Sequence, residues 1–162
     1  MSLTQPLRKL TLLAHVLCSV GWTGAVAAFL ALAVTGLNSP GPVLVRAVYI
    51  AMPPITTWII VPLAILSLVT GLVLSICTPW GLLRHYWIIF KLLISAASLP
   101  LLFLHMSIIR RVAKVAIDTT LPFTGLREDR QQLVVASAAS LAALVAAALL
   151  SVYKPRGRTG WY

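Results

Sequence analysis

The stretch VPLAILSLVTGLVLSICTPWGLLRHYWIIFKLL, residues 61–93, places two apolar segments on either side of the short turn CTPWG. The two segments belong to longer apolar runs, residues 43–77 and 86–109. A helix needs about 20 consecutive apolar residues to cross the hydrocarbon core of a bilayer, and each run is long enough. Because the turn is tight, the two helices must be antiparallel neighbours. The stretch therefore predicts a helical hairpin that spans a membrane twice.

Two further apolar runs, residues 10–34 and 133–153, have the same character. Of the 162 residues, 60% are hydrophobic and only 10% are charged, whereas about a quarter of the residues in a soluble domain are charged. This composition excludes an ordinary soluble domain. We predict an all-α integral membrane four-helix bundle that forms a single transmembrane domain over residues 1–162. The expected helices cover about residues 8–36, 45–77, 82–115 and 131–153.

Turns, prolines and charges divide the chain between these helices. The most polar segment, residues 110–130, is expected to form a loop that contains a short interfacial helix, RRVAKVAI. Residues 154–162 form a basic tail. Proline removes a backbone hydrogen bond inside a helix, so Pro53-Pro54, Pro62 and Pro100 should bend or interrupt their helices. Cys18 and Cys77 have no motif partner, which argues against a disulfide framework or a zinc site.

The net charge of +10 arises from 13 basic and three acidic residues. The basic residues flank the apolar runs, a pattern that fits anionic lipid headgroups and argues against nucleic acid as a partner. The positive-inside rule orients membrane proteins by the Lys and Arg residues in their loops. Each side of the predicted bundle carries six Lys or Arg residues, so the rule alone does not decide the orientation in the membrane. The charged N-terminus and the basic tail favour both termini in the cytoplasm.

The last apolar run, VVASAASLAALVAAALLSVY, is rich in Ala and Ser. Small side chains let membrane helices approach each other closely. We therefore expect this helix to pack tightly, and the protein to form a homo-oligomer, such as a dimer, or to pair with another membrane subunit.

The strongest chemical signal is a small set of ionisable residues inside the apolar runs, where such residues mark function by default. His15 lies in the first run, and His85, Lys91 and His105 lie in or beside the third. Lys91, Ser95, Ser98, Leu102 and His105 are spaced four, three, four and three apart, so they form one stripe on a helix face. His15 follows Lys9 by six residues and Lys91 follows His85 by six. Because the two helices run in the same direction, His15 and Lys91 should lie at one level.

Histidines inside a helical bundle, with basic side chains near the surface, are the ingredients of a haem b site. In this interpretation His15 is an axial ligand and His85 is the second ligand from the same side. Arg84 or Lys91 pairs with a propionate, and Trp22 packs against the porphyrin. His105 lies about 30 Å from His85 along the helix, so the three candidate metal ligands, His15, His85 and His105, do not share one compact ion. His105 is left for a second haem or a subunit contact. The function would be electron transfer or sensing.

Other interpretations stay open beside haem. His15 can be satisfied by a hydroxyl from Ser67, Thr70 or Ser75, and Lys91 can extend its amine toward the surface. The protein would then be a cofactor-free scaffold or assembly subunit. Alternatively, the stripe from Lys91 to His105 serves a small solute or ion transporter. Hydrolytic chemistry is disfavoured, because the only carboxylate side chains are Asp118, Glu128 and Asp129, all in one polar loop, and no hydrolase or transferase motif is present. We expect no catalytic residues.

The segments HVLCSVGWTGAVAAFLAL, PWGLLRHYWIIFK and SVYKPRG resemble those of a family of small bacterial, mostly actinobacterial, integral membrane proteins of unassigned function. The resemblance covers nearly the whole chain and is most specific in PWGLLRHYWIIFK. It implies four helices, a bacterial cytoplasmic membrane and a signature block that includes His85, Trp87 and Lys91. It implies no activity.

Overall fold

The computed structural model describes residues 4–77, 85–118 and 123–154, and these residues contain helices and no strands. The elements in chain order are α1 (Gln5–Asn38), α2 (Pro42–Ile55), the π-helical segment η1 (Thr56–Ile60), α3 (Val61–Cys77), α4 (Tyr86–Ile117), the 3₁₀ turn η2 (Phe123–Leu126) and α5 (Arg127–Tyr153).

Four helical spans are long and apolar enough to cross a membrane: α1, the continuous rod from Pro42 to Cys77, α4 and α5. The predicted all-α four-helix bundle is therefore confirmed. At 1.5 Å per residue the spans are about 40–54 Å long, which exceeds the hydrocarbon thickness of about 30 Å, so they must tilt or extend into the headgroup region. Large apolar side chains such as Leu17, Val20 and Leu104 are more than 60% exposed, as expected of surfaces that face lipid.

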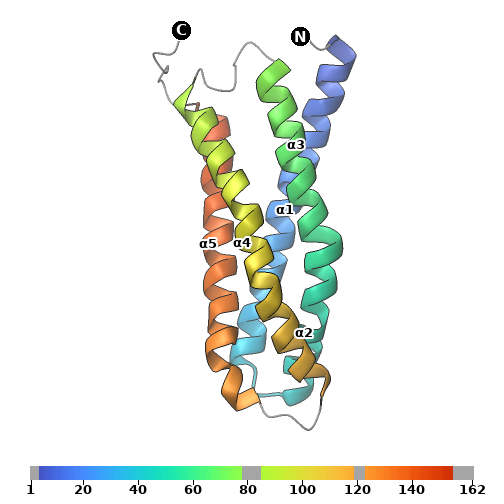
Figure 1. Cartoon of the computed structure of the whole chain (residues 1–162), viewed down its shortest axis with the longest axis vertical. Helices are drawn as coiled ribbons and strands as arrows, with labels where there is room; N and C mark the ends of the chain where they lie inside the picture. Colours follow the sequence, from blue (N-terminus) through green and yellow to red (C-terminus); the bar gives the residue numbers. More distant parts are fainter. Residues whose placement is uncertain (1–3, 78–84, 119–122, 155–162) are drawn as a thin grey trace.

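The four spans run alternately up and down, so the ends of the bundle have different contents (Figure 1). At one end α1 and α4 begin and α3 and α5 finish; we call this the terminal end. At the other, the connection end, α1 and α4 finish and α2 and α5 begin. α1 packs against α3 and α5, and α4 packs against α2 and α5. The buried core contains Trp22, Phe29, Tyr49, Met52 and Val112, among other residues.

The proline pair alters the second span without breaking it. Pro53 and Pro54 lie near the end of α2, and the next five residues, Thr56–Ile60, adopt π-helical hydrogen bonding before α3 continues. Proline lacks the N–H that an α-helix needs, and a π-segment is one way in which a helix accommodates a local disruption. Pro62 and Pro100 lie inside α3 and α4, which continue through them.

Residues 110–117 do not form a separate interfacial helix, and this expectation was wrong. RRVAKVAI is the uninterrupted last part of α4. Ile109, Val112, Ala113 and Ala116 are buried, and their helical spacing puts one apolar face against the bundle. No proline or glycine separates them from the preceding turns, so the helix continues while its basic residues stay on the outer face.

Two arginines close the connection end by binding the last carbonyls of helices. Nη1 of Arg46 donates to the carbonyl oxygens of Val115, Ala116 and Asp118, at 3.2, 3.1 and 2.8 Å. Arg130 donates to the carbonyls of Gly36 and Leu37 at the end of α1 and to the Tyr49 hydroxyl. Terminal carbonyls lack partners within their own helix and carry the negative end of its dipole. Both arginines therefore link helices at the connection end.

Candidate functional site: a basic cavity at the terminal end

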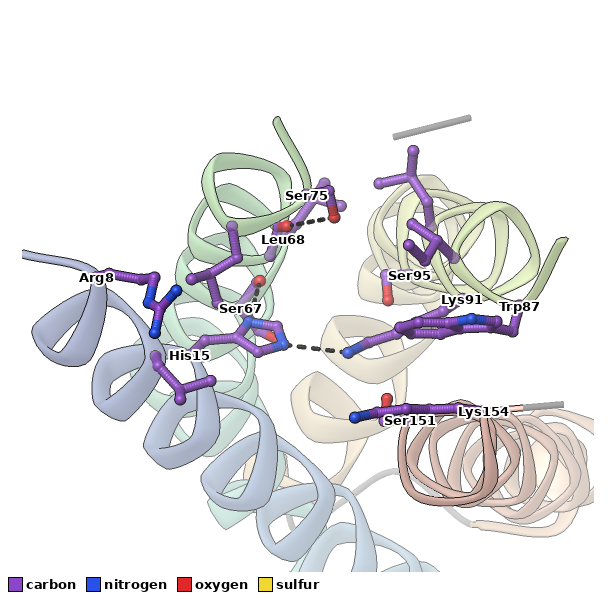
Figure 2. Close-up of a pocket in the computed structure, with 15 residues that line it drawn as sticks. Arg8, His15, Ser67, Leu68, Ser75, Trp87, Lys91, Ser95, Ser151 and Lys154 are labelled. Carbon is purple, nitrogen blue, oxygen red and sulfur yellow. Dashed lines mark hydrogen bonds between the residues drawn. The ribbon is translucent and has the colours of Figure 1, made fainter. Parts of the chain in front are cut away.

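A cavity of about 420 Å³ lies between α1, α3, α4 and α5 near the terminal end (Figure 2). Much of its wall is apolar, including Leu12, Leu74 and Ile88. Its ionisable side chains are Arg8 and His15 from α1, Lys91 from α4, and Lys154, which follows α5. In Figure 2, Lys91 and Lys154 both extend toward α1. We call this space the basic cavity.

His15 is held in one orientation by α3. Its Nδ1 lies 3.0 Å from the Ser67 carbonyl oxygen and 3.1 Å from Thr70 Oγ1. The carbonyl can only accept, and the Thr70 hydroxyl already donates to Leu66 at 2.6 Å, so Nδ1 carries the proton. In the neutral ring Nε2 is then the acceptor. Of the three hydroxyls predicted as alternative partners, those of Ser67, Thr70 and Ser75, that of Thr70 contacts His15. Ser67 contacts it through its backbone carbonyl instead.

Gly71 makes this placement of His15 possible. A Cβ atom at position 71 would lie 2.9 Å from His15 Cε1 and 3.3 Å from Nδ1. Real side chains essentially never approach so closely, and the imidazole is only 9% exposed. The glycine therefore lets α3 approach the ring, a common use of small residues between membrane helices.

Lys91 meets His15 across the cavity. Its Nζ lies 3.3 Å from His15 Nε2, so the lysine donates and the imidazole accepts (Figure 2). The contact confirms that His15 and Lys91 lie at one level in the bundle. An ammonium group has three donors, and within the part of the chain that the structure describes His15 takes one of them. The other two are available to a molecule in the cavity.

The positive charge of the basic cavity is not balanced by an acidic side chain. All three carboxylate side chains lie at the connection end: Asp118 follows α4, and Glu128 and Asp129 are in the first turn of α5. The 27 residues of α5 separate the ends by about 40 Å. Electrostatic interactions are strengthened where water is partly excluded, so the positive charges of Arg8, Lys91 and Lys154 would favour an anion in this cavity.

The other sequence-predicted site residues lie elsewhere. His85 is the residue before α4, and its ring centroid is 6.2 Å from that of Trp87. His105 and Trp22 line a second cavity. Arg84 lies outside the described residues. Of the proposed haem-binding residues, the structure thus brings His15 and Lys91 together in the basic cavity. In the described ranges there is no group of three or more His, Cys, Asp or Glu side chains placed to hold a metal ion.

Two cationic residues of the basic cavity, Arg8 and Lys154, were interpreted from sequence only as charges flanking the apolar runs. The signal that identifies them is topological: in a bundle of four alternating spans, the start of the first helix and the end of the fourth meet at one end. The structure shows in addition that Gly71 makes room for His15.

Comparison of the chain with protein-family models, with curated proteins and with solved structures finds no match. The family resemblance seen in the sequence therefore stays a prediction, and the function must be argued from the geometry of the site.

Proposed function

We propose that this multi-pass membrane protein binds an amphipathic anion in the basic cavity. The observation that carries the proposal is the cluster of Arg8, Lys91 and Lys154 around a partly apolar cavity, with every acidic side chain at the opposite end. A basic pocket between membrane helices is typical of sites for anionic lipid headgroups. A carboxylate or phosphate group would neutralise the cluster, while an apolar body would contact Leu12, Leu74 and Ile88. A bacterial cytoplasmic membrane is the location that we propose.

The residues have separate roles in this proposal. Lys91 binds the anionic group with the donors that His15 does not occupy. His15 is a positioning residue, because the fixed Nδ1–H leaves Nε2 to orient the lysine. Arg8 lies in the first turn of α1 and Lys154 directly follows α5, so these two basic side chains attract the ligand at the terminal end of the cavity.

The test is calorimetric titration of the purified protein, in a non-ionic detergent, with hexyl phosphate. A hydrogen bond to a charged group contributes about 1.5–3 kcal/mol, so Lys91→Gln should weaken binding at least tenfold. Lys9→Gln is the matched control, because Lys9 is exposed, lies at the same end and does not line the cavity. It should change the affinity less than about twofold. Equal losses in both variants would mean that hexyl phosphate responds only to net charge, and would contradict the proposal.

Haem b is a second candidate, because it is itself an amphipathic anion with two propionates. The observation in its favour is the protonated Nδ1 of His15 held by a backbone carbonyl, an arrangement typical of histidines that ligate metals through Nε2. Iron would replace Lys91 at Nε2, and Lys91 would be left to pair with a propionate. Addition of haem b to the purified protein should then give a Soret band that His15→Ala removes. A band of unchanged position and intensity in that variant would exclude His15 as ligand.

A further inference from the structure

A second cavity, of about 170 Å³, lies deeper in the bundle between α1, η1, α4 and α5. We call it the inner cavity. Trp22 and Phe29 form part of its apolar wall, and both are at most 6% exposed. Ser98, Leu102 and His105 of the predicted stripe on α4 line it, whereas Lys91 and Ser95 line the basic cavity. The stripe therefore faces two separate spaces inside the bundle.

The hydrogen bonds around the inner cavity leave it rich in acceptors. Four polar lining side chains donate their proton to a carbonyl of the preceding helical turn. These bonds are Thr56 to Met52 at 2.8 Å, Ser98 to Ile94 at 2.7 Å, Ser137 to Leu133 at 2.6 Å, and His105 Nδ1 to Leu101 at 2.7 Å. What these groups can still offer a ligand is a lone pair: three hydroxyl oxygens and, in neutral His105, Nε2.

Among the described residues that line the inner cavity, two more carry a polar group: Ser140 has a hydroxyl and Trp22 has an indole N–H. With acceptors in the majority, the favoured ligand group is one that donates a hydrogen bond and accepts at most one or two. A hydroxyl group meets this description. A carboxylate or phosphate does not, because it only accepts, and no Lys or Arg among the described residues lines this space. The inner cavity therefore has the opposite hydrogen-bonding preference to the basic cavity.

The volume of the inner cavity and the position of its opening limit the class of ligand that can bind there. An apolar cavity of about 150 Å³ accommodates benzene, so 170 Å³ suits one six-membered ring with a small substituent. Leu101 of α4 is 54% exposed, and Ala139 and Ser140 of α5 are exposed, yet all three line the cavity. Their helices are membrane spans. The opening between α4 and α5 thus faces lipid, and an uncharged ligand dissolved in the bilayer can reach it.

We propose that the inner cavity is a site for a small uncharged aromatic alcohol of the phenol class, which enters from the bilayer and donates its hydroxyl proton to His105 Nε2. Trp22 and Phe29 supply aromatic surface for the ring, and the Trp22 N–H or the Ser140 hydroxyl can donate to the ligand oxygen. This site is independent of anion binding in the basic cavity.

The test uses two probes that differ in one proton. Binding of 4-fluorophenol and of its methyl ether, 4-fluoroanisole, is followed by fluorine NMR with the purified full-length protein. One neutral hydrogen bond contributes about 1 kcal/mol, which corresponds to about fivefold in affinity. We expect saturable phenol binding that is about fivefold tighter than that of the ether. His105→Leu should remove this preference, whereas His85→Leu, a matched change outside the cavity, should retain it.

The wild-type comparison decides the proposal even if a variant fails to fold, since it needs no substitution. Equal affinity for phenol and ether, or no saturable binding of either probe, would overturn it. So would an unchanged preference in folded His105→Leu protein, because the hydroxyl would then be recognised elsewhere. Hexyl phosphate at a saturating concentration should leave phenol binding unchanged, which separates this result from the outcome at the basic cavity.

Discussion

At the scale of single residues, His15 shows what the sequence can and cannot predict. A histidine two turns inside an apolar run must have a partner, because an unsatisfied polar group in hydrocarbon costs several kcal/mol. That argument predicted a hydroxyl partner from Ser67, Thr70 or Ser75. The equal spacings of His15 from Lys9 and of Lys91 from His85 predicted that His15 and Lys91 lie at one level. Neither argument predicted that the main partner is a backbone carbonyl, because every residue has one and the sequence does not show which carbonyl a neighbouring helix presents.

The fit between His15 and Gly71 gives a prediction at this scale. Gly71→Ala places a methyl group 2.9 Å from His15 Cε1, and such overpacking costs about 1–3 kcal/mol. The imidazole must shift away from Ser67 and Lys91, so we expect a lower unfolding temperature and at least fivefold weaker binding of hexyl phosphate.

Gly24→Ala is the control for Gly71→Ala, because nothing lies within 4 Å of a Cβ at that position. Alanine is the better helix former by about 1 kcal/mol, so this variant should be as stable as the wild type or more stable. Thermal unfolding in detergent and the same titration measure both variants. If Gly71→Ala retained wild-type affinity and stability, the described position of His15 would be contradicted.

At the scale of elements, hydropathy predicted the spans well, because the need to cover about 30 Å of hydrocarbon acts on whole segments. Hydropathy failed to predict the structure of a segment that is held by packing against other helices rather than by contact with lipid. Residues 110–117 carry three basic side chains and were expected to form a separate interfacial helix, yet α4 continues through them because Val112, Ala113 and Ala116 pack on the bundle. The mean hydropathy of a charged segment does not reveal that one face of its helix is apolar.

The link between α1 and α5 at the connection end should contribute strongly to stability. Arg130 binds the carbonyls of Gly36 and Leu37, and its guanidinium lies 5.5 Å from the centroid of the Tyr49 ring. Arg130→Gln loses several charge-assisted hydrogen bonds, each stronger than a neutral one, and should destabilise the protein by about 2–4 kcal/mol.

Arg127→Gln is the matched control for Arg130→Gln. Arg127 is exposed and lies one turn earlier in α5, and surface substitutions usually change stability by less than about 0.5 kcal/mol. Denaturation in mixed micelles compares the two. Similar unfolding free energies for the two variants would show that the Arg130 contacts do not hold α1 to α5.

At the scale of the whole molecule, the two ends of the bundle differ in what their basic side chains contact. At the connection end Arg46 and Arg130 bind helix carbonyls, and Arg111 pairs with Asp129 at 3.3 Å. At the terminal end Arg8, Lys91 and Lys154 surround the basic cavity. From the sequence, each side of the bundle was predicted to carry six basic residues, and nothing in the sequence distinguished the two sets. The fold shows that Arg46, Arg111 and Arg130 bind groups at the connection end, and that Arg8, Lys91 and Lys154 line a space that can take a ligand.

Association with a second copy or another subunit stays a prediction at this scale. The Ala- and Ser-rich helix expected to make that contact is α5, and its residues Ala136, Ser140 and Ala143, which share one face, are intermediate or exposed. Ala136 and Ser140 also line the inner cavity, so bulky substitutions there would affect the cavity as well as any subunit contact.

The central claim, that the basic cavity selects an amphipathic anion, is tested most directly by the sign of the ligand's charge. Wild-type protein in a non-ionic detergent is titrated with hexyl phosphate, hexanol and hexyltrimethylammonium, which share one apolar chain. Because three cationic side chains line the cavity and all acidic side chains lie at the other end, we predict that the phosphate binds at least tenfold more tightly than the alcohol and that the ammonium shows no saturable binding. Equal affinity for the three ligands, or tighter binding of the ammonium, would contradict the account.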